Sequence, residues 1–580
     1  MSAPFARLDF RNRPPRLYTP FTRILTAHTL AEVAPAIAEL SAALASGQVA
    51  VGFIGYEAAP AFDPALTTHP PAGPLPLLWF GLAAAYQPAP DLPPTPPPTL
   101  TDWQPALTRA DYTMRFDTLL AHIAAGDTYQ VNFTFPLRGV YTGERAALYA
   151  HLRRAQPHAY SAWIHTAEWD VFSASPELFF ALDGAQLTTR PMKGTARRGR
   201  TSAEDAETAA ALRASQKERA ENVMIVDLLR NDLSRVAETG SVGVPDLFTL
   251  ERYSTLWQMT STVTATRRAD TDLWSLLAAL FPCGSITGAP KVRTMQLIAE
   301  QEVAPRGVYC GAIGALDAPD QMLFNVAIRT LTVAADGPAS YAVGSGLVAD
   351  SQAEAEYVEC LLKSRVLFAP PRPTFDLLES LCFDPAHGYT LLERHLARLA
   401  DSAAYFDYPC DPIAIRAELL SASANWPALQ KVCLTLSASG AVAIAAADLT
   451  PPGWRLPRTV ALAAAPIDPT DVFLYHKTTH RAVYDAAQAA CPPNAETVVL
   501  FNPHGELTES ITANLAVEID GVWVTPPVSS GLLAGTLRAE LLATGQLTER
   551  VVTLADLPRI TGWRLFNSVR GLWDVTWVTQ

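Results

Sequence analysis

Residues 343–363, VGSGLVADSQAEAEYVECLLK, decide the fold of the first part of the chain. The Gly-rich start continues a β run that begins at Ala339, and the remainder, QAEAEYVECLLK, has the pattern of a helix. Glu356 and Glu359 lie three positions apart in that helix, which places both carboxylates on one face. The stretch therefore predicts a strand followed by a helix that carries a pair of acidic side chains.

A second pair of glutamates repeats this spacing. Glu218 and Glu221 lie in QKERAENVMIVDLL, which is also strongly helical. Two like charges on one face repel mildly, and a solvent-exposed face explains a single pair equally well. The recurrence beside a Gly-rich loop favours function, because two facing pairs would give the oxygen-only, partly hydrated shell that Mg²⁺ prefers. We therefore predict that these four glutamates bind Mg²⁺.

Two further motifs point to an anionic ligand. GSITGAPKVRTM (residues 284–295) feeds small residues into a helix start, where free backbone N–H groups receive anions; an ordinary Gly/Pro-rich helix start is the alternative. VYCGAIGAL and NVAIRTL place Tyr309 and Arg329 on predicted strands. An arginine in an apolar strand is costly unless it is paired, and a carboxylate ligand and a structural salt bridge both satisfy this requirement.

Two lysines lie in contexts that are weak signals when each is taken alone. Lys193 lies in RPMKGTARRGR, where a charged side chain is expected to face solvent, and ARRGR is predicted to be a solvated loop. Lys477 lies in FLYHKTTHRAVYDAA, at the end of a predicted strand and before a helix. Neighbouring tyrosine, histidine and threonine residues only weakly indicate catalysis.

The composition bounds the class of protein. The 580 residues are 49% hydrophobic and 17% charged, which predicts a compact protein of two to four domains. The net charge of −13 argues against nucleic-acid binding but allows an anionic small substrate. Seven scattered cysteines without a C-x-x-C pair, and an N-terminus without an apolar signal segment, predict a cytoplasmic protein with free thiols.

Proline-rich breaks suggest the domain boundaries. We predict a short N-terminal lobe over 1–100, a catalytic domain over 101–368, a Pro-rich linker over 369–373 and a second domain over 374–580. Residues 87–98, QPAPDLPPTPPP, are predicted to be a polyproline-like connector. The first part alternates amphipathic helices with β runs, which indicates α+β or layered α/β structure with mostly antiparallel pairing.

The ordered motifs SPELFF, RPMKGT, KERAENVMIVDLLRNDLSRV, FPCGSITGAPKVR, YCGAIG, IRTL and GSGLVADSQAEAEYVECLLK resemble the chorismate-utilising enzymes over residues 108–368. The resemblance implies a sandwich of two large antiparallel sheets with helices outside. It implies that Glu221 and Glu359 bind Mg²⁺ directly, and that Glu218 and Glu356 act mainly through water. It also implies a substrate-binding set, which comprises Gln130, Thr195, Tyr309, Arg329, the backbone of Gly344 and Gly346, and Lys363.

Within that family, a lysine in P-x-K-G-T is similar to the aminodeoxychorismate synthases, where it acts as the nucleophile. The resemblance makes Lys193 the nucleophile and Glu177, in SPEL, the general acid. Gln130 matches a position that is lysine in water-using relatives. A glutamine cannot deprotonate water, so ammonia is expected to be the incoming nucleophile that supplies the amino group. Gln258 occupies a position where the family has a histidine. No glutaminase domain is recognisable, so ammonia is expected from a separate glutaminase subunit or from solution.

Residues 374–580 resemble the branched-chain-aminotransferase-like pyridoxal-phosphate enzymes, which implies a two-subdomain α/β fold. Lys477 would bind the cofactor covalently and Glu509, in LTES, would pair with its pyridinium nitrogen. Arg398, Thr512 and Thr536 would hold the phosphate. The first strand, FDLLESL, lacks the Gly-Asp-Gly of relatives, and Ser380 would replace a threonine near the cofactor. A homodimer through this domain is expected.

NSVRG in this domain is most similar to the aminodeoxychorismate lyases. A domain that makes aminodeoxychorismate, fused to one that consumes it, predicts bifunctional p-aminobenzoate synthesis from chorismate with Mg²⁺ and pyridoxal phosphate. Two alternatives stay open. One is an anthranilate synthase-like component fused to a D-amino-acid or branched-chain-type aminotransferase, and the other is a non-catalytic chorismate-binding partner subunit.

Overall fold

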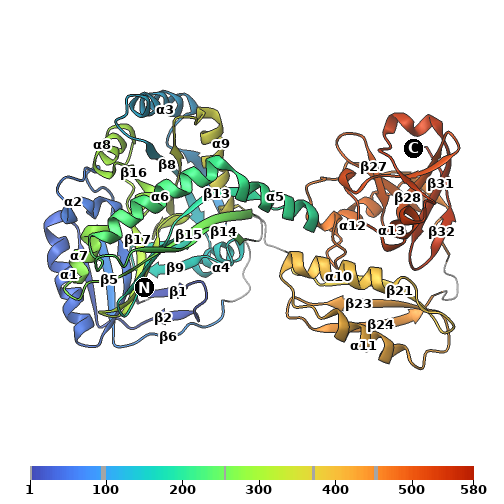
Figure 1. Ribbon diagram of the computed structural model, residues 1–580, viewed down its shortest axis with the longest axis horizontal. Coiled ribbons are helices and arrows are strands. Elements are labelled where there is room, and N and C mark those ends of the chain that lie inside the picture. Colours follow the sequence, from blue (N-terminus) through green and yellow to red (C-terminus); the bar gives the residue numbers. More distant parts are fainter. Residues whose placement is uncertain (1–2, 93–98, 254–255, 369–372, 450–454, 580) are drawn as a thin grey trace. The chain divides into compact units, whose positions relative to one another are not determined.

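The structure is a computed structural model that describes residues 3–92, 99–253, 256–368, 373–449 and 455–579. The chain forms two compact units (Figure 1). The first comprises Met1–Ala196 and Ala211–Arg372, and the second comprises Arg197–Ala210 and Pro373–Gln580. The second unit therefore includes a short segment that lies more than 160 positions before the rest of that unit in the sequence.

The first unit contains two ten-stranded sheets. One is antiparallel and runs in the order β16 (Gly288–Ala289), β8 (Gln130–Thr142), β20 (Pro338–Leu347), β19 (Thr330–Ala334), β10 (Trp169–Ser175), β9 (Tyr160–His165), β1 (Phe5–Asp9), β2 (Arg16–Tyr18) and β6 (Gln87–Pro88), with β7 (Thr99–Pro105) paired to β8. The other runs β13 (Met192–Arg197), β15 (Leu256–Thr266), β12 (Gln186–Arg190), β11 (Leu178–Asp183), β18 (Gln321–Val326), β17 (Ala312–Ala318), β4 (Val49–Ile54), β5 (Leu78–Ala83) and β3 (Arg23–Ala27), with β14 (Gly243–Arg252) paired to β15.

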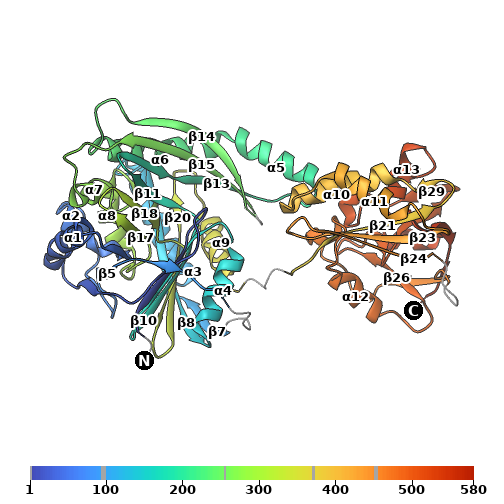
Figure 2. The ribbon, with the colours of Figure 1, turned by 90° about the horizontal axis from the view of Figure 1, so that it is seen from below.

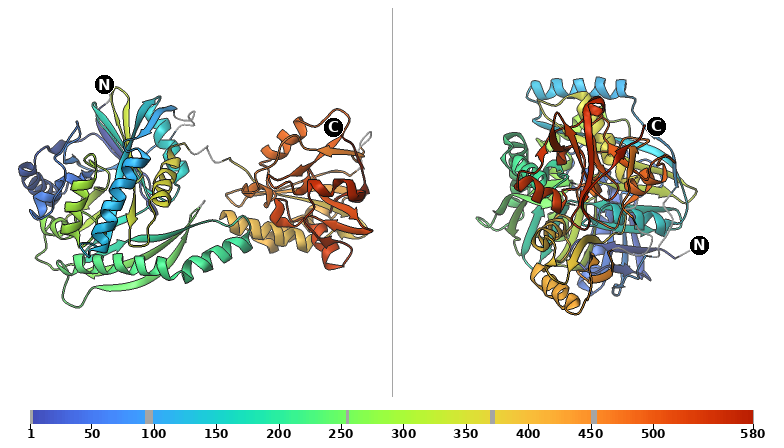
Figure 3. Two further views of the ribbon diagram at one scale, coloured as in Figure 1. Left: turned by 90° about the horizontal axis from the view of Figure 1, so that it is seen from above. Right: turned by 90° about the vertical axis from the view of Figure 1, so that its right-hand side faces the viewer.

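Helices cover the outer faces of both sheets. A core that includes Leu8, Phe53 and Ile313 lies between the sheets, because their inward-facing side chains are apolar. Helices α1 (Leu30–Ala45), α6 (Gln216–Ser234) and α7 (Leu273–Leu280) pack on the second sheet, and Figure 2 shows α6 along β15. Helices α3 (Arg109–Ala124), α4 (Arg145–Ala155) and α9 (Ala353–Ser364) pack on the first sheet, where α3 lies across β8 (Figure 3). The predicted two-sheet sandwich with outer helices is confirmed.

The remaining elements of the first unit are short connections between sheets and helices. They are η1 (Tyr56–Ala58), α2 (Ala59–Phe62), η2 (Gly284–Ile286), α8 (Lys291–Gln301) and η3 (Arg365–Leu367). Helix α5 (Ser202–Ala214) begins in the second unit and ends in the first.

The second unit has two subdomains, as predicted. A four-stranded sheet runs β22 (Gly388–Tyr389), β21 (Leu377–Asp384), β23 (Gln430–Leu436) and β24 (Val442–Asp448), under α10 (Leu392–Phe406) and α11 (Pro412–Ser423). The nine-stranded sheet runs β30 (Thr548–Glu549), β29 (Val522–Thr525), β28 (Asn514–Ile519), β27 (Leu507–Ser510), β26 (Thr497–Phe501), β25 (Thr459–Leu462) and β33 (Thr576–Trp577), with β31 (Ile560–Asn567) on β28 and β32 (Gly571–Asp574) on β31. The other elements are η4 (Val472–Leu474), α12 (Ala482–Ala489), η5 (Val528–Ser530), α13 (Thr536–Ala543) and η6 (Leu554–Arg559).

Several predicted boundaries differ from the structure. Residues 1–100 are not a separate lobe, because β1, β2 and β6 extend one sheet and β3, β4 and β5 extend the other. Residues 197–210 do not belong to the catalytic domain predicted over 101–368. In the predicted connector, Gln87–Pro88 is a strand and residues 93–98 lie outside the described residues, as do residues 369–372 of the predicted linker.

In the described parts of the chain, every helix is too short or too polar to cross a membrane.

Candidate active sites

Lys193 lies on edge strand β13, where its neighbours hold the backbone tightly. Gly194 has φ +92°, and a Cβ there would lie 3.1 Å from Glu218 Oε2, so only glycine lets this strand approach α6. The Gln258 side chain donates to the Gly194 carbonyl at 2.9 Å and accepts from the Thr195 hydroxyl at 2.9 Å. Gln258, which replaces a family histidine, therefore positions the turn on which Lys193 lies.

Lys193 and Gln130 converge over Gly346. A Cβ on Gly346 would lie 2.7 Å from Lys193 Nζ and 2.8 Å from Gln130 Nε2, so the glycine leaves room for both polar groups. Gln130 is only 1% exposed, and neither atom of its amide has a partner among the described residues. A buried amide without partners is costly and indicates that a ligand completes its hydrogen bonds. Gly288, with φ +151°, brings the predicted anion-receiving loop against the Gln130 carbonyl.

Glu177 is a buried carboxyl between β10 and β11, and it receives a hydrogen bond of 2.6 Å from the Ser285 hydroxyl. Burial raises the pKa of Glu177 to about 7, although Ser285 and Lys193 both lower it. Such a group is part protonated near neutral pH and can donate a proton. Ser285 was not predicted as a site residue, and its only signal was its place in GSITGAPKVRTM.

The Lys193 amine is partly buried rather than solvated. Desolvation lowers its pKa and the neighbouring Lys363 lowers it further, whereas Glu221, Glu177 and Glu359 oppose both effects. Five charged groups from distant parts of the sequence therefore influence one another here. The lowered pKa increases the neutral, nucleophilic fraction of the amine.

Glu218 and Glu221 lie in the first turns of α6, as predicted. Ser215 caps the helix and accepts a hydrogen bond from the Glu218 backbone at 3.3 Å. Burial raises the pKa of Glu218, and the nearby carboxylates of Glu221 and Glu359 raise it further. A divalent cation would relieve this repulsion, so the donor set fits Mg²⁺. In the described ranges, no three His, Cys, Asp or Glu side chains already form a metal-binding cluster.

The second glutamate pair lies on α9, and both of its carboxylates have partners. Glu356 accepts from the Ser351 hydroxyl at 2.7 Å. Lys363 Nζ lies 2.8 Å from Glu359 and donates to the Gly344 carbonyl at 2.8 Å. Burial raises the pKa of Glu359, but Lys363 and the other nearby lysines outweigh burial, and the net shift is downward. Cation binding by Glu359 would therefore require this ion pair to loosen.

Gly344 and Gly346 lie on β20 where strand pairing engages only one edge. β19 pairs with β20 at residues 339–341, whereas β8 pairs along residues 338–347. A Cβ on Gly344 would lie 2.5 Å from Thr134 Cγ2, so this strand also requires glycine for close approach. Among the described strands, none pairs with the other edge of the Gly344–Gly346 segment, and substrate binding there stays a prediction.

Tyr309 and Arg329 do not lie on strands, so that prediction is wrong. Tyr309 is in the turn before β17, and Arg329 lies between β18 and β19 with φ +49°. Arg329 donates to the Gln156 side chain, and the described residues offer it no carboxylate. Desolvation lowers its pKa, and Tyr341 lies close enough to affect both Arg329 and Tyr309. The structural salt bridge is therefore not found among the described residues, and a carboxylate ligand for Arg329 stays a prediction.

The second unit contains a cavity of about 460 Å³ that gathers the residues predicted to hold pyridoxal phosphate. These are Ser380, Arg398, Lys477, Glu509, Thr512 and Thr536, from five separate segments. Thr512 is exposed, whereas Thr536 is buried at the start of α13. The volume is in the range of small-molecule sites. Arg570, in NSVRG, also lines the cavity and was not predicted as a site residue.

Lys477 follows η4, and its carbonyl accepts from the Leu378 backbone at 2.9 Å. Desolvation lowers the pKa of its amine to about 8, with Arg398 as the next cause. Glu509 is buried and accepts from Tyr484 at 2.8 Å, from Asn514 at 3.1 Å and from the Leu533 backbone at 3.1 Å. Burial raises the pKa of Glu509 to about 7. A lysine with a lowered pKa and a buried, oriented carboxyl fit the cofactor that the resemblance implies.

A buried network fixes Arg398 at the edge of this cavity. Two guanidinium nitrogens donate to Glu379 at 2.9 and 2.7 Å, and His395 contacts Glu379 at 2.6 Å and Thr536 at 3.2 Å. Although burial raises the pKa of Glu379, Arg398 and His395 lower it to about 2. Glu379 was missed because it lies in FDLLESL, the strand that departs from the relatives' motif.

Comparison with known proteins places both units in families. Residues 18–369 match the family described as chorismate binding enzyme, and residues 376–578 match amino-transferase class IV. Aminodeoxychorismate synthase component 1 of Escherichia coli K12 is 43% identical over 271 residues, which cover 46% of this chain and 60% of that protein. Anthranilate synthase component 1 of Streptomyces coelicolor is 41% identical over 271 residues, which cover 47% of this chain and 53% of that protein.

A solved structure supports the fold of the first unit. Anthranilate synthase component I from Streptococcus pneumoniae TIGR4 superimposes with a TM-score of 0.51 at 25% identity, covering 64% of this chain and 93% of that chain. The chain spans about 60% of the length of the Escherichia coli relative. Relatives with two different activities match it almost equally, so individual residues must distinguish the product. Residues 376–578 match the amino-transferase class IV model, and the chain belongs to the chorismate binding enzyme family through residues 18–369.

Proposed function

We propose that the chain converts chorismate to p-aminobenzoate in two consecutive reactions. The first unit would aminate chorismate to 4-amino-4-deoxychorismate, and the second would eliminate pyruvate. The observation that carries the proposal is the convergence of Lys193 Nζ and the partnerless Gln130 amide over Gly346. An amine nucleophile beside a group that cannot deprotonate water favours ammonia as the incoming molecule.

The first reaction balances as two allylic displacements. The neutral Lys193 amine attacks the ring carbon far from the hydroxyl, and the hydroxyl leaves as water with a proton from Glu177. Ammonia then attacks the vacated carbon, the lysine amine leaves, and the surplus proton returns to Glu177. The configuration at that carbon is retained because the reaction uses two displacements in sequence, and the second reverses the stereochemical change of the first. Gln130 would donate a hydrogen bond from its amide N–H to the substrate, and Tyr309 and Arg329 would hold a carboxylate.

Magnesium would be held by Glu218, Glu221, Glu356 and Glu359, and when bound it supplies Lewis-acid polarisation of substrate oxygens.

We expect Glu221→Gln to raise the Mg²⁺ concentration needed for half-maximal thermal stabilisation at least about tenfold, because a ligand charge is lost. Thermal unfolding against Mg²⁺ concentration measures this. Asp227→Asn, an exposed change on the same helix, is the matched control. An unchanged midpoint for Glu221→Gln would contradict the metal assignment.

The pH dependence of amination tests the acid role of Glu177. Glu177 is active when protonated, so the rate is expected to fall as pH rises through its pKa of about 7. Because the Ser285 hydroxyl lowers this pKa, Ser285→Ala should move the descending limb to higher pH. Rate profiles between pH 5 and 9 measure the shift, and Ser421→Ala on exposed α11 is the control. A limb that moves to lower pH would exclude this role.

The second reaction would use the cavity of the second unit. Pyridoxal phosphate, when bound, supplies an electron sink for the elimination. Lys477 would remove the proton from the ring carbon that bears the amino group. The bond between the ring carbon and the enolpyruvyl oxygen then breaks, which leaves p-aminobenzoate. The released enolpyruvate becomes pyruvate when its terminal carbon takes up a proton. Glu509 would hold the cofactor nitrogen, and Arg398, Thr512 and Thr536 would hold its phosphate, with Ser380 nearby.

Ammonia would come from a separate glutaminase subunit or from solution. The name component 1 of the relatives implies only that they have a second component. We also propose that the protein is cytoplasmic and that it forms a homodimer through the second unit.

One incubation tests the function. The purified chain is mixed with chorismate, ammonium and Mg²⁺, with and without pyridoxal phosphate, and the aromatic product is identified by chromatography. p-Aminobenzoate that depends on pyridoxal phosphate is the expected result. Anthranilate would instead support the anthranilate synthase alternative, and chorismate binding without turnover would support a non-catalytic subunit.

A further inference from the structure

Residues 197–210, here called the strap, were expected to begin as a solvated loop but pack within the second unit. The Arg198 side chain is 5% exposed and pairs with Asp205 at 2.7 Å. The Gly199 backbone also donates to Asp205 at 2.9 Å, and a Cβ on Gly199 would lie 2.1 Å from the Asp205 nitrogen. The buried Asp205 carboxylate thus holds the start of the strap against the start of helix α5. Only a glycine at position 199 lets the two segments come this close.

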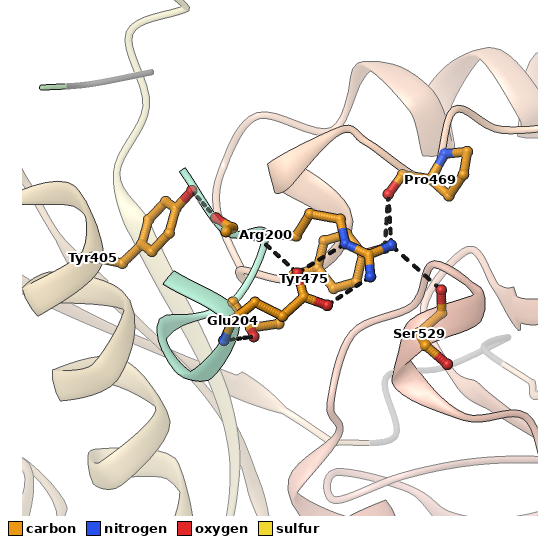
Figure 4. Close-up of polar contacts among 8 residues, drawn as sticks. Arg200, Glu204, Tyr405, Pro469, Tyr475 and Ser529 are labelled. Atoms are coloured by element: carbon orange, nitrogen blue, oxygen red, sulfur yellow. Dashed lines mark hydrogen bonds and ion pairs between the residues drawn. The ribbon is translucent and has the colours of Figure 1, made fainter. Parts of the chain in front are cut away.

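Arg200 joins the strap to the segment that carries Lys477 (Figure 4). Its guanidinium donates to the Tyr475 hydroxyl at 2.8 Å and to the carbonyls of Pro469 and Ser529, each at 3.4 Å. Glu204 orients the same guanidinium with contacts of 2.6 and 2.9 Å. Charge-assisted hydrogen bonds of this kind are stronger than neutral ones and fix geometry.

Tyr405 makes a second connection between the strap and that segment. Its hydroxyl donates to the Gly199 carbonyl at 2.7 Å, and the Arg198 guanidinium lies 4.3 Å over its ring. The Tyr405 ring also contacts the His476 ring, at a centroid distance of 4.3 Å. Ser402 also contacts His476 Nδ1 at 2.9 Å. The strap therefore reaches, directly or through Tyr405, both residues that precede Lys477.

We propose that the strap is a positioning element for the second active site, in which Arg200 and Tyr405 hold Tyr475 and His476 so that the Lys477 amine points into the cavity. Neither Arg198 nor Arg200 lines the cavity, so they act through the backbone of the Lys477 segment. The inference rests on the proposed role of Lys477. If the strap has this role, residues 373–580 do not contain all the contacts that position Lys477. The missing contacts come from the sequence between Lys193 and Glu218.

The full chain with Arg200→Ala tests this by hydrogen exchange, without substrate or cofactor. Amides in residues 472–480 are expected to exchange about tenfold faster, the effect of losing one charge-assisted hydrogen bond. Arg200→Lys should give an intermediate rate because it keeps the charge near Glu204 but not the forked donors. Arg416→Ala, which removes an exposed arginine–glutamate pair of the same unit, should leave these amides unchanged. Pyridoxal phosphate titration should show weaker binding for Arg200→Ala than for the wild type, and unchanged binding for Arg416→Ala.

Unchanged exchange in residues 472–480 of Arg200→Ala would overturn the proposal. Equal acceleration in residues 130–142 of the first unit would also overturn it, because the effect would then be global. If Arg200→Ala does not fold, Tyr405→Phe removes only the hydroxyl bonded to Gly199 and should still accelerate exchange about threefold. Failure of the Lys477 reaction alone would leave these exchange rates intact, so the two failures are distinguishable.

Discussion

Lys193→Ala is expected to lower the rate of chorismate amination by about 10³-fold or more, because it removes the nucleophile. We expect the loss of the Lys193 side chain to disturb the fold little, because Lys193 lies on edge strand β13 and Gln258 holds the neighbouring residues. Binding of chorismate should therefore persist while turnover is lost. Chromatographic assay of 4-amino-4-deoxychorismate from chorismate, ammonium and Mg²⁺ measures the change.

Lys193→Arg is the matched variant for this prediction. Arginine keeps the positive charge near Glu221 and Glu177 but stays protonated and cannot attack the ring. If Lys193 only balanced the charge of these carboxylates, Lys193→Arg would retain most of the activity. Retention of more than about a tenth of the wild-type rate by either variant would remove the nucleophile role.

Lys477→Ala is expected to stop p-aminobenzoate formation while the first reaction continues. Loss of the group that binds the cofactor and moves the proton should lower the second rate by about 10³-fold or more. The amination rate of the same protein is an internal control for folding of the first unit. The measurement is the ratio of 4-amino-4-deoxychorismate to p-aminobenzoate at saturating pyridoxal phosphate.

The outcome for Lys477→Ala has two parts. 4-Amino-4-deoxychorismate should accumulate, and a separately added aminodeoxychorismate lyase should convert it to p-aminobenzoate. Undiminished p-aminobenzoate from Lys477→Ala would show that another group performs the elimination. His480→Ala, a change of a second residue on the cavity wall, helps to separate loss of the lysine from disturbance of the segment.

The pattern of residues predicted the local elements well. The glutamate pairs at 218/221 and 356/359 lie on α6 and α9, and the apolar runs around Phe53 and Val343 are strands. These features depend on short-range periodicity, which a sequence displays directly. The residue types of both candidate sites were also predictable, because they follow ordered motifs.

Other features were not predictable from local pattern. Tyr309 and Arg329 lie outside the strands, because a left-handed backbone at Cys310 and at Arg329 interrupts each apolar run. Ser285 and Glu379 became visible only when folding brought them to Glu177 and Arg398. Their types are common and carry no motif of their own.

The sequence by itself determined the helices, the strands, the family and the residue types that the two reactions need, because each follows from near-neighbour spacing or from motif order. Only the tertiary structure decided the environments that tune those residues and the place of the strap. Burial sets the pKa of Glu177 and of Lys477 through desolvation by distant segments. Likewise, Arg200 meets Tyr475 across 275 positions of sequence, a contact that no local pattern encodes.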